Sequence, residues 1–162
     1  MSSIFVETED QRAILETVRR FNEAVVAPVA AELDRRDDPA DCFSWDIVEA
    51  ADAAGIRTMT LTEEWGGIGA DSLTTAMVIE ELAKADMGIA VVMAQTLKLA
   101  QVLQKATTPE QRDRYVPIFR DDPRGLLAIG ITEPETASNY FLPHPSPFRT
   151  AAEKTEGGWV IN

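Results

Sequence analysis

The spacing of apolar residues predicts helices over most of the first 120 residues. From residue 8 to about residue 33 the apolar positions recur at steps of three and four, which places them on one face of a helix. Pro28 falls inside this pattern, and because an interior proline removes a backbone hydrogen bond, we expect a kink or a restart there. The predicted buried positions are Ile14, Val18, Phe21, Val25 and Val29.

Two further helices are bounded by capping residues. Ser44 can cap a helix that ends at Gly55, and Asp71 or Ser72 can cap a helix that runs to about Lys84. The apolar positions of these two helices are Ile47, Val48, Ala51 and Ala54, then Leu73, Ala76, Met77, Ile79 and Leu82.

The next two helices differ in character. Residues 89–105 begin with apolar residues on most of the circumference, which is typical of a central helix in a bundle. A last helix starts with strong signals: Thr108 as cap, Pro109 in the first turn and Gln111 to complete a capping box.

After Gly125 the apolar residues no longer recur at steps of three and four. Residues 126–132, "LLAIGIT", form a short apolar run that predicts a strand, and "FRTAAEKTEGGWVIN" predicts a hairpin with a turn at Glu-Gly-Gly. Helices followed by strands indicate two segregated parts. We therefore expect a mainly α chain, with a helical domain over residues 1–122 and the beginning of a β-domain over residues 123–162.

A glycine cluster, Gly66, Gly67 and Gly69, precedes the helix that starts near residue 72. A phosphate-binding loop would need a strand before it and a helix after it. Because helices are predicted on both sides, the sequence favours a tight turn that needs positive φ.

Charge and composition restrict the function. The net charge of −12 argues against duplex nucleic acid and against an anionic membrane surface. The apolar segment around residues 89–103 is interrupted by polar residues and falls short of the ~20 apolar residues that span a bilayer. The N-terminus does not read as a signal peptide. The single Cys42 suggests a reducing, cytoplasmic compartment, and the single His144 predicts no zinc site.

Four segments, in order, resemble the acyl-CoA dehydrogenase family of flavoproteins. They are "AVVAPVAAELDR", "AGIRTMTLTEEWGGIGAD", "TPEQRDRYVPIF" and "AIGITEPETASN". The resemblance implies an N-terminal helical domain, a middle β-domain and a C-terminal helical domain, with FAD bound between the last two, usually in tetramers. This chain would supply the first domain and only the opening of the second. We therefore expect a fragment, or a subunit that another chain completes.

The resemblance also implies site residues. Ile129, Ile131 and Thr132 would contact the isoalloxazine ring of FAD, and Ser138 would lie near its pyrophosphate and the thioester ligand. Such donors suit a flavin, which gains negative charge as it accepts a hydride. Pro134 cannot donate to a strand ladder, so it makes the chain leave the ladder there.

The family's acyl pocket is lined by its fourth helix, so Gln95, Thr96 and Leu99 are candidates to face the substrate, with core packing as the alternative for each. The catalytic carboxylate belongs to the family's C-terminal domain, so the chain is expected to contain no catalytic base. Glu133 is no substitute, since its role in the motif is structural.

The sequence departs from the family motif at Thr136, Ala137 and Asn139, and its loop "YFLPHPSP" is longer. Three functions stay open. The first is the N-terminal part of an acyl-CoA dehydrogenase that passes electrons to an electron-transfer protein, in a dimer or tetramer. The second is a flavin oxygenase or oxidase of the same fold, and the third is a helical partner subunit without chemistry of its own.

Overall fold

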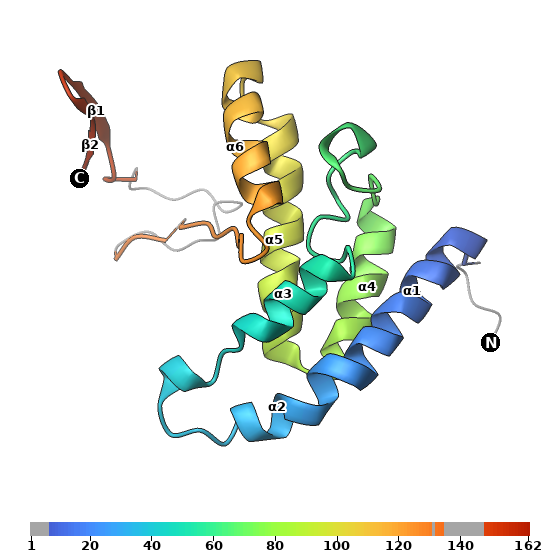
Figure 1. Cartoon of the computed structure of the whole chain (residues 1–162). Coiled ribbons are helices and arrows are strands. Elements are labelled where there is room, and N and C mark those ends of the chain that lie inside the picture. The colour runs from blue at the N-terminus through green and yellow to red at the C-terminus, as the bar shows by residue number, and fades with distance from the viewer. Residues whose placement is uncertain (1–6, 131, 135–147) are drawn as a thin grey trace. The chain divides into compact units, whose positions relative to one another are not determined.

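The computed structural model describes residues 7–130, 132–134 and 148–162, and most of these residues are helical (Figure 1). The mainly α fold class predicted from the apolar pattern is therefore confirmed. The chain divides into two compact units, Met1–Ala128 and Ile129–Asn162, which are described separately. The boundary expected near residue 122 stays a prediction.

The first unit consists of helices joined by short loops. Two single turns of 3₁₀ helix, Pro39–Asp41 and Glu63–Trp65, lie in the loops. The α-helices are α1 (Glu9–Phe21), α2 (Ala27–Leu33), α3 (Trp45–Ala53), α4 (Ser72–Ala83), α5 (Met87–Lys105) and α6 (Pro109–Asp121).

The restart expected at Pro28 is present. A five-residue π-helical turn, Asn22–Val26, separates α1 from α2, and the N–H of Ala27 donates to the carbonyl of Asn22, five residues back. Pro28 then sits in the first turn of α2, where its missing N–H costs little. The wider turn also changes which residue is buried. Val26 is fully buried, whereas Val25, which was predicted to be buried, is only partly so.

The predicted helix starts are largely confirmed. Thr108 and Gln111 form the capping box at the start of α6, and the same motif, from Thr8 and Gln11, opens α1. Asp71 caps α4 by accepting a hydrogen bond from the N–H of Thr74 at 2.7 Å. At α3 the cap position, Ser44, is right, but its side chain makes no capping bond.

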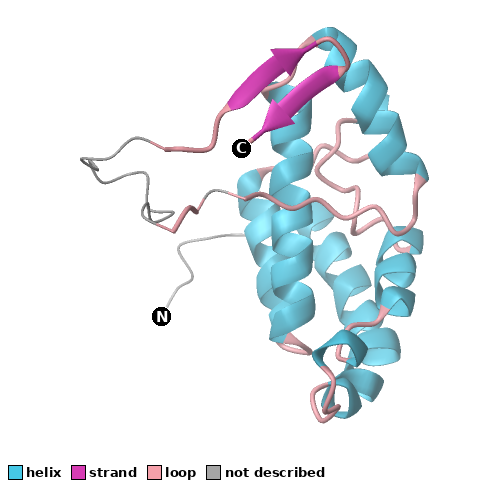
Figure 2. Ribbon diagram, turned by 90° about the vertical axis from the view of Figure 1, so that its left-hand side faces the viewer, coloured by secondary structure: helices cyan, strands magenta, loops and turns pink. Residues whose placement is uncertain are grey.

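The helices of the first unit lie side by side (Figure 2). Their buried apolar side chains form one large core and one small core. α4 packs between α1 and α5, and α6 packs on α5. The large core collects apolar side chains from α1 to the first half of α5. The small core lies where α5, α6 and the loop after α3 meet, and its buried members are Leu61, Ala100, Val116 and Phe119.

The central helix α5 has 19 residues, because it begins at Met87 and not near residue 89 as expected. By length and composition alone α5 could cross a membrane. Its apolar character has another explanation, since Ile89, Met93 and Leu97 are buried in the large core.

The glycine cluster lies in the loop between α3 and α4, with no strand directly before it. It therefore lacks the strand–loop–helix context of a phosphate-binding loop. Gly66 and Gly69 have φ of 86° and 63°, as expected for a tight turn. Gly67 serves a different purpose, because a Cβ there would stand 2.1 Å from the carbonyl oxygen of Leu61.

The strand predicted for residues 126–132 was wrong for the part that the structure describes, since residues 126–130 have no strand pairing. A strand needs a hydrogen-bonded neighbour, and instead Leu126 and Leu127 pack against the helical cores. The hairpin in the second unit is confirmed: β1 (Ala152–Thr155) pairs antiparallel with β2 (Gly158–Ile161).

Candidate functional site

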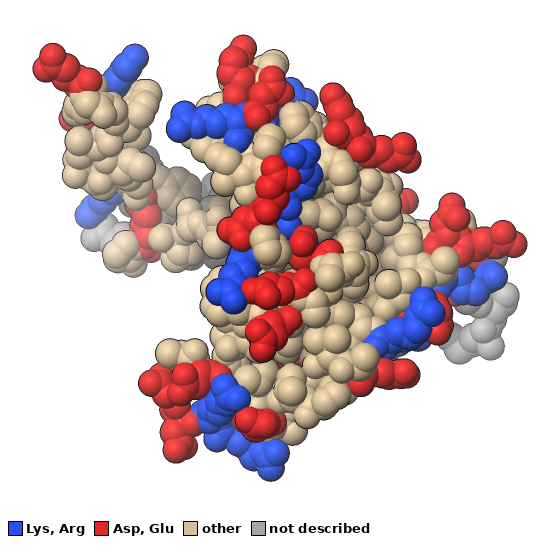
Figure 3. All heavy atoms as spheres, in the orientation of Figure 1, with Lys and Arg blue, Asp and Glu red and all other residues tan. Residues whose placement is uncertain are grey.

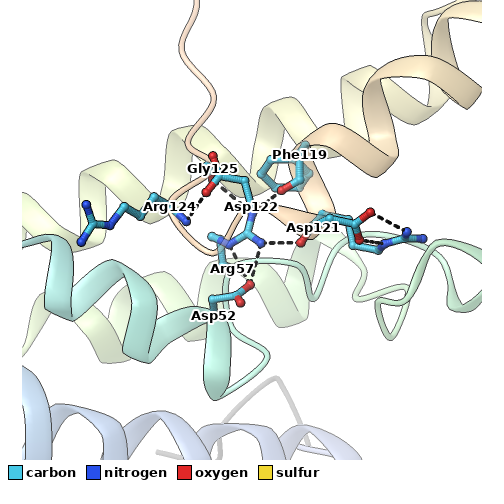
Figure 4. Close-up of polar contacts among 8 residues, drawn as sticks. Asp52, Arg57, Phe119, Asp121, Asp122, Arg124 and Gly125 are labelled. Atoms are coloured by element: carbon cyan, nitrogen blue, oxygen red, sulfur yellow. Dashed lines mark hydrogen bonds and ion pairs between the residues drawn. The ribbon is translucent and has the colours of Figure 1, made fainter.

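The candidate site is the segment that leaves α6 and runs to the Thr-Glu-Pro turn. It starts with a turn in which the N–H of Gly125 donates to the carbonyl of Asp122 at 2.8 Å. The fully buried side chain of Arg57, from the loop after α3, holds this turn (Figure 4). Its Nη1 donates to the carbonyls of Phe119 at 2.9 Å and of Gly125 at 3.1 Å.

The remaining donors of Arg57 are also used. Nη2 donates to the carbonyl of Arg120 at 2.9 Å, and Asp52 accepts from Nε at 2.8 Å and pairs with Nη2 at 2.6 Å. The guanidinium carbon lies 4.7 Å from the centre of the Phe119 ring. The charge of Arg57 is therefore paired with a carboxylate and shared among three carbonyls, two in the last turn of α6 and one at Gly125.

Beyond the turn, two leucines rest on the helical unit. Leu126 packs on the large core and Leu127 on the small one. The N–H of Leu127 donates to Oγ1 of Thr96 on α5 at 3.4 Å. The chain is thus tied to the helices up to residue 127.

The next residues are open to solvent. The Ile129 side chain is 51% exposed, and a Cβ built on Gly130 would meet nothing within 4 Å. Thr132 is exposed, and neither its hydroxyl nor the N–H groups of Ile129 and Gly130 donate to any described residue. Such free donors fit a ligand with hydrogen-bond acceptors along an aromatic edge, as the flavin ring has.

Glu133 in the Thr-Glu-Pro turn has a structural role, as predicted. Its Oε2 accepts from the N–H of Arg149 at 2.7 Å, and its Oε1 accepts from the N–H of Thr150 at 2.8 Å. These bonds lower the pKa of Glu133, and the bond from the N–H of Arg149 has the largest effect. The carboxylate is ionised and occupied, so it is poorly suited to take a proton from a substrate.

The candidate substrate residues of α5 differ in exposure. Gln95 is exposed, Leu99 is half-buried, and Thr96 is fully buried against Leu127. The burial of Thr96 agrees with the core-packing alternative.

The other two candidate residues, Ile131 and Ser138, lie outside the described residues, as do Thr136, Ala137, Asn139 and His144. Their assignments stay predictions.

Charged side chains of both signs are mixed on the surface. On the face shown in Figure 3, basic side chains lie among acidic ones. Within the described ranges, no three His, Cys, Asp or Glu side chains are placed to hold a metal ion.

The residue that sequence reasoning missed is Arg57. Its only signal is a charged residue inside the otherwise uncharged run "AGIRTMTL". A lone arginine in a loop is ordinarily solvated, so its burial could be found only once α6 was placed against that loop.

Comparison with known proteins agrees with the fold. Residues 8–121 match the family described as "Acyl-CoA dehydrogenase, N-terminal domain". The chain is 31% identical to a short-chain specific acyl-CoA dehydrogenase of Clostridium acetobutylicum, over 82% of this chain and 34% of that protein. It is also 31% identical to a 3-sulfinopropanoyl-CoA desulfinase of Paraburkholderia xenovorans, over 98% of this chain and 38% of that protein.

A solved structure is similar as well. The butyryl-CoA dehydrogenase of Megasphaera elsdenii superposes with a TM-score of 0.74 at 27% identity, covering 98% of this chain and 40% of that one. The chain thus spans between 34% and 38% of the length of the two curated relatives. Because the family match covers residues 8–121 and the fold agrees, the chain belongs to the acyl-CoA dehydrogenase family.

Proposed function

We propose that the chain is the N-terminal portion of an FAD-dependent acyl-CoA dehydrogenase. The reaction is α,β-dehydrogenation of an acyl-CoA thioester: a carboxylate outside this chain removes the α-proton, and FAD, when bound, accepts the β-hydride. The observation that carries the proposal is the exposure of Ile129, Gly130 and Thr132, since the N–H groups of the first two and the hydroxyl of Thr132 have no partner among the described residues.

In this proposal the chain binds and orients rather than moves protons. Ile129 and Ile131 contact the isoalloxazine mainly through their backbone, and Thr132 adds its hydroxyl. Ser138 lies near the pyrophosphate of FAD and the thioester. Gln95 and Leu99 on α5 face the acyl chain, and Thr96, with its buried hydroxyl bonded to Leu127, supports them from behind.

The hairpin supports the expectation that further polypeptide completes the flavin site. Trp159 and Ile161 on β2 are 66% and 70% exposed. A two-stranded hairpin is marginally stable alone, so side chains of this size favour burial against more β-structure. We also propose that the complete protein is a cytoplasmic dimer or tetramer and that an electron-transfer protein reoxidises it.

A second candidate keeps the fold and the flavin but changes the reaction. The similarity to a desulfinase equals that to a dehydrogenase, at 31% identity each. The residues of this chain therefore leave other flavin chemistry, including an oxygenase or oxidase, as the alternative. A helical partner subunit without chemistry is the third candidate.

One purification separates the three. The protein is isolated from its natural host by a tag on this chain, with everything that it carries, and its absorbance is recorded under anaerobic conditions before and after addition of saturated acyl-CoA thioesters of several lengths. A dehydrogenase is yellow, bleaches with one of these thioesters, and regains its colour with an electron-transfer protein. An oxygenase forms a flavin hydroperoxide when it is reduced and then exposed to oxygen. A preparation that is colourless, or whose flavin stays entirely with a separate co-purified chain, indicates the partner subunit.

A further inference from the structure

We propose that Arg57 is a positioning residue for the segment that carries Ile129 and Thr132. It fixes the residue at which the chain leaves the helical unit. The inference deepens the proposed function and rests on it, because the segment's role is contact with the flavin. Nothing in the family match or the relatives assigns a role to this position.

The first support is that all three nitrogens of the Arg57 guanidinium are engaged. A guanidinium has five N–H groups in a fixed fork. Nε donates to Asp52, Nη1 donates to the carbonyls of Phe119 and Gly125, and Nη2 donates to the carbonyl of Arg120 and forms an ion pair with Asp52. A side chain held at every nitrogen cannot shift without breaking bonds, so it acts as a rigid clamp.

The second support is the place of its acceptors. Phe119 and Arg120 belong to the last turn of α6, whose carbonyls have no partner within the helix. A cation is favourable there because of the helix dipole. Gly125 is the first residue after the turn, and its carbonyl shares Nη1 with that of Phe119. One side chain therefore joins the end of α6 to the start of the exit segment.

The third support is the fit of Gly125. A Cβ at this position would lie 2.7 Å from the carbonyl oxygen of Phe119 and 3.2 Å from Nη1 of Arg57. The backbone of residue 125 is thus in close contact with the clamp, which only glycine permits. Gly125→Ala should push the exit segment away without removing the arginine.

The fourth support is that the segment has few other attachments. After the bond from the N–H of Leu127 to Thr96, the described residues 128–130 make no hydrogen bond to another described residue. Seven positions separate Gly125 from Thr132. The last described attachments of this segment to the helical unit are therefore those at Gly125 and Leu127.

The test has one arm that needs no flavin. Amide hydrogen exchange is measured on the chain by itself for the wild type, Arg57→Lys, Gly125→Ala and a control, Leu82→Ala, which opens a fully buried site on α4 in the large core. Lysine keeps the charge but lacks the fork. We expect Arg57→Lys and Gly125→Ala to speed exchange at Leu127 by about tenfold or more, as for loss of one charge-assisted hydrogen bond. Leu82→Ala should leave the exchange rate of the Leu127 amide unchanged when each protein is measured at the same number of degrees below its own melting temperature.

The second arm uses the complete flavoprotein. Arg57→Lys and Gly125→Ala should each raise the Kd of FAD by about tenfold and shift the flavin absorbance, whereas the stability-matched Leu82→Ala should change neither. If Leu127 exchange is unchanged in both variants, or if Leu82→Ala has the same effects, the positioning role is overturned while the proposed function stands. If the wild type takes up no flavin, the proposed function fails and this inference fails with it.

Discussion

The carboxylate of Glu133 shows how a single residue organises the Thr-Glu-Pro turn. It binds two consecutive N–H groups, at Arg149 and Thr150, sixteen and seventeen residues further along the chain. The bonds favour the ionised form, so the pKa is lowered from its ordinary value. A group of this kind stabilises the folded turn at any pH above its unfolded pKa, and this contribution is lost as the pH falls through the lowered folded value.

The pH dependence of this turn is therefore predictable. On acidification below the ordinary glutamate range, the amide proton signals of Arg149 and Thr150 should move upfield together as the carboxylate is protonated, and NMR titration measures this. In Glu133→Gln the amide group offers one acceptor oxygen instead of two, so at least one of the two signals should already be shifted at neutral pH and should no longer titrate. Signals that titrate equally in the variant would contradict the assignment.

Two glycines of the turn before α4 differ in why they are needed. Gly67→Ala should cost about 3 kcal/mol or more of unfolding free energy, because the new Cβ would overlap the carbonyl oxygen of Leu61. Gly69→Ala has open space around it but a φ of 63°, so it should cost about 1–2 kcal/mol. Urea denaturation of both variants checks the order, and equal losses would contradict it.

At the scale of elements, local chemistry predicted the helix ends better than the buried faces. The capping box of α6 depends on Thr108 and Gln111, a pair three positions apart that is visible in the sequence. The buried face after Phe21 is different: the π turn inserts one extra residue, so Val26 rather than Val25 enters the core. A periodicity of 3.6 cannot anticipate that shift. The prediction that Leu73 is buried was wrong for a similar reason. The helices around α4 decide which of its faces is buried, and they leave Leu73 44% exposed.

The capping box at α6 gives a test at this scale. Thr108→Ala removes the side-chain acceptor of the Gln111 N–H and should lower the unfolding free energy by about 1 kcal/mol. Asp113→Ala, on an exposed position of the same helix, should change it by less than about 0.5 kcal/mol. Thermal unfolding followed by circular dichroism measures both, and a Thr108 variant as stable as the Asp113 control would show that the cap is not needed.

For the whole molecule, the sequence predicted the class of fold and the family but not the anchoring of the candidate site. The strand expected at residues 126–132 follows from local composition, yet pairing requires a neighbouring strand, which local composition cannot supply. The contact between Arg57 and Gly125 joins residues 68 positions apart, so it emerges only from the packing of α6 against the loop after α3. The exit from a strand ladder expected at Pro134 has no counterpart in the part of the chain that is described, since residues 126–130 and 132 form no strand.

The central claim is that Thr132 meets a flavin, and the most direct measurement is the Kd of FAD for the complete protein carrying Thr132→Val. Valine keeps the shape and removes the hydroxyl, so fluorescence titration should show binding weakened about fivefold to tenfold, the loss of one hydrogen bond. Thr155→Val, on exposed strand β1, should bind FAD as the wild type does. A Thr132→Val protein with unchanged affinity would contradict the claim.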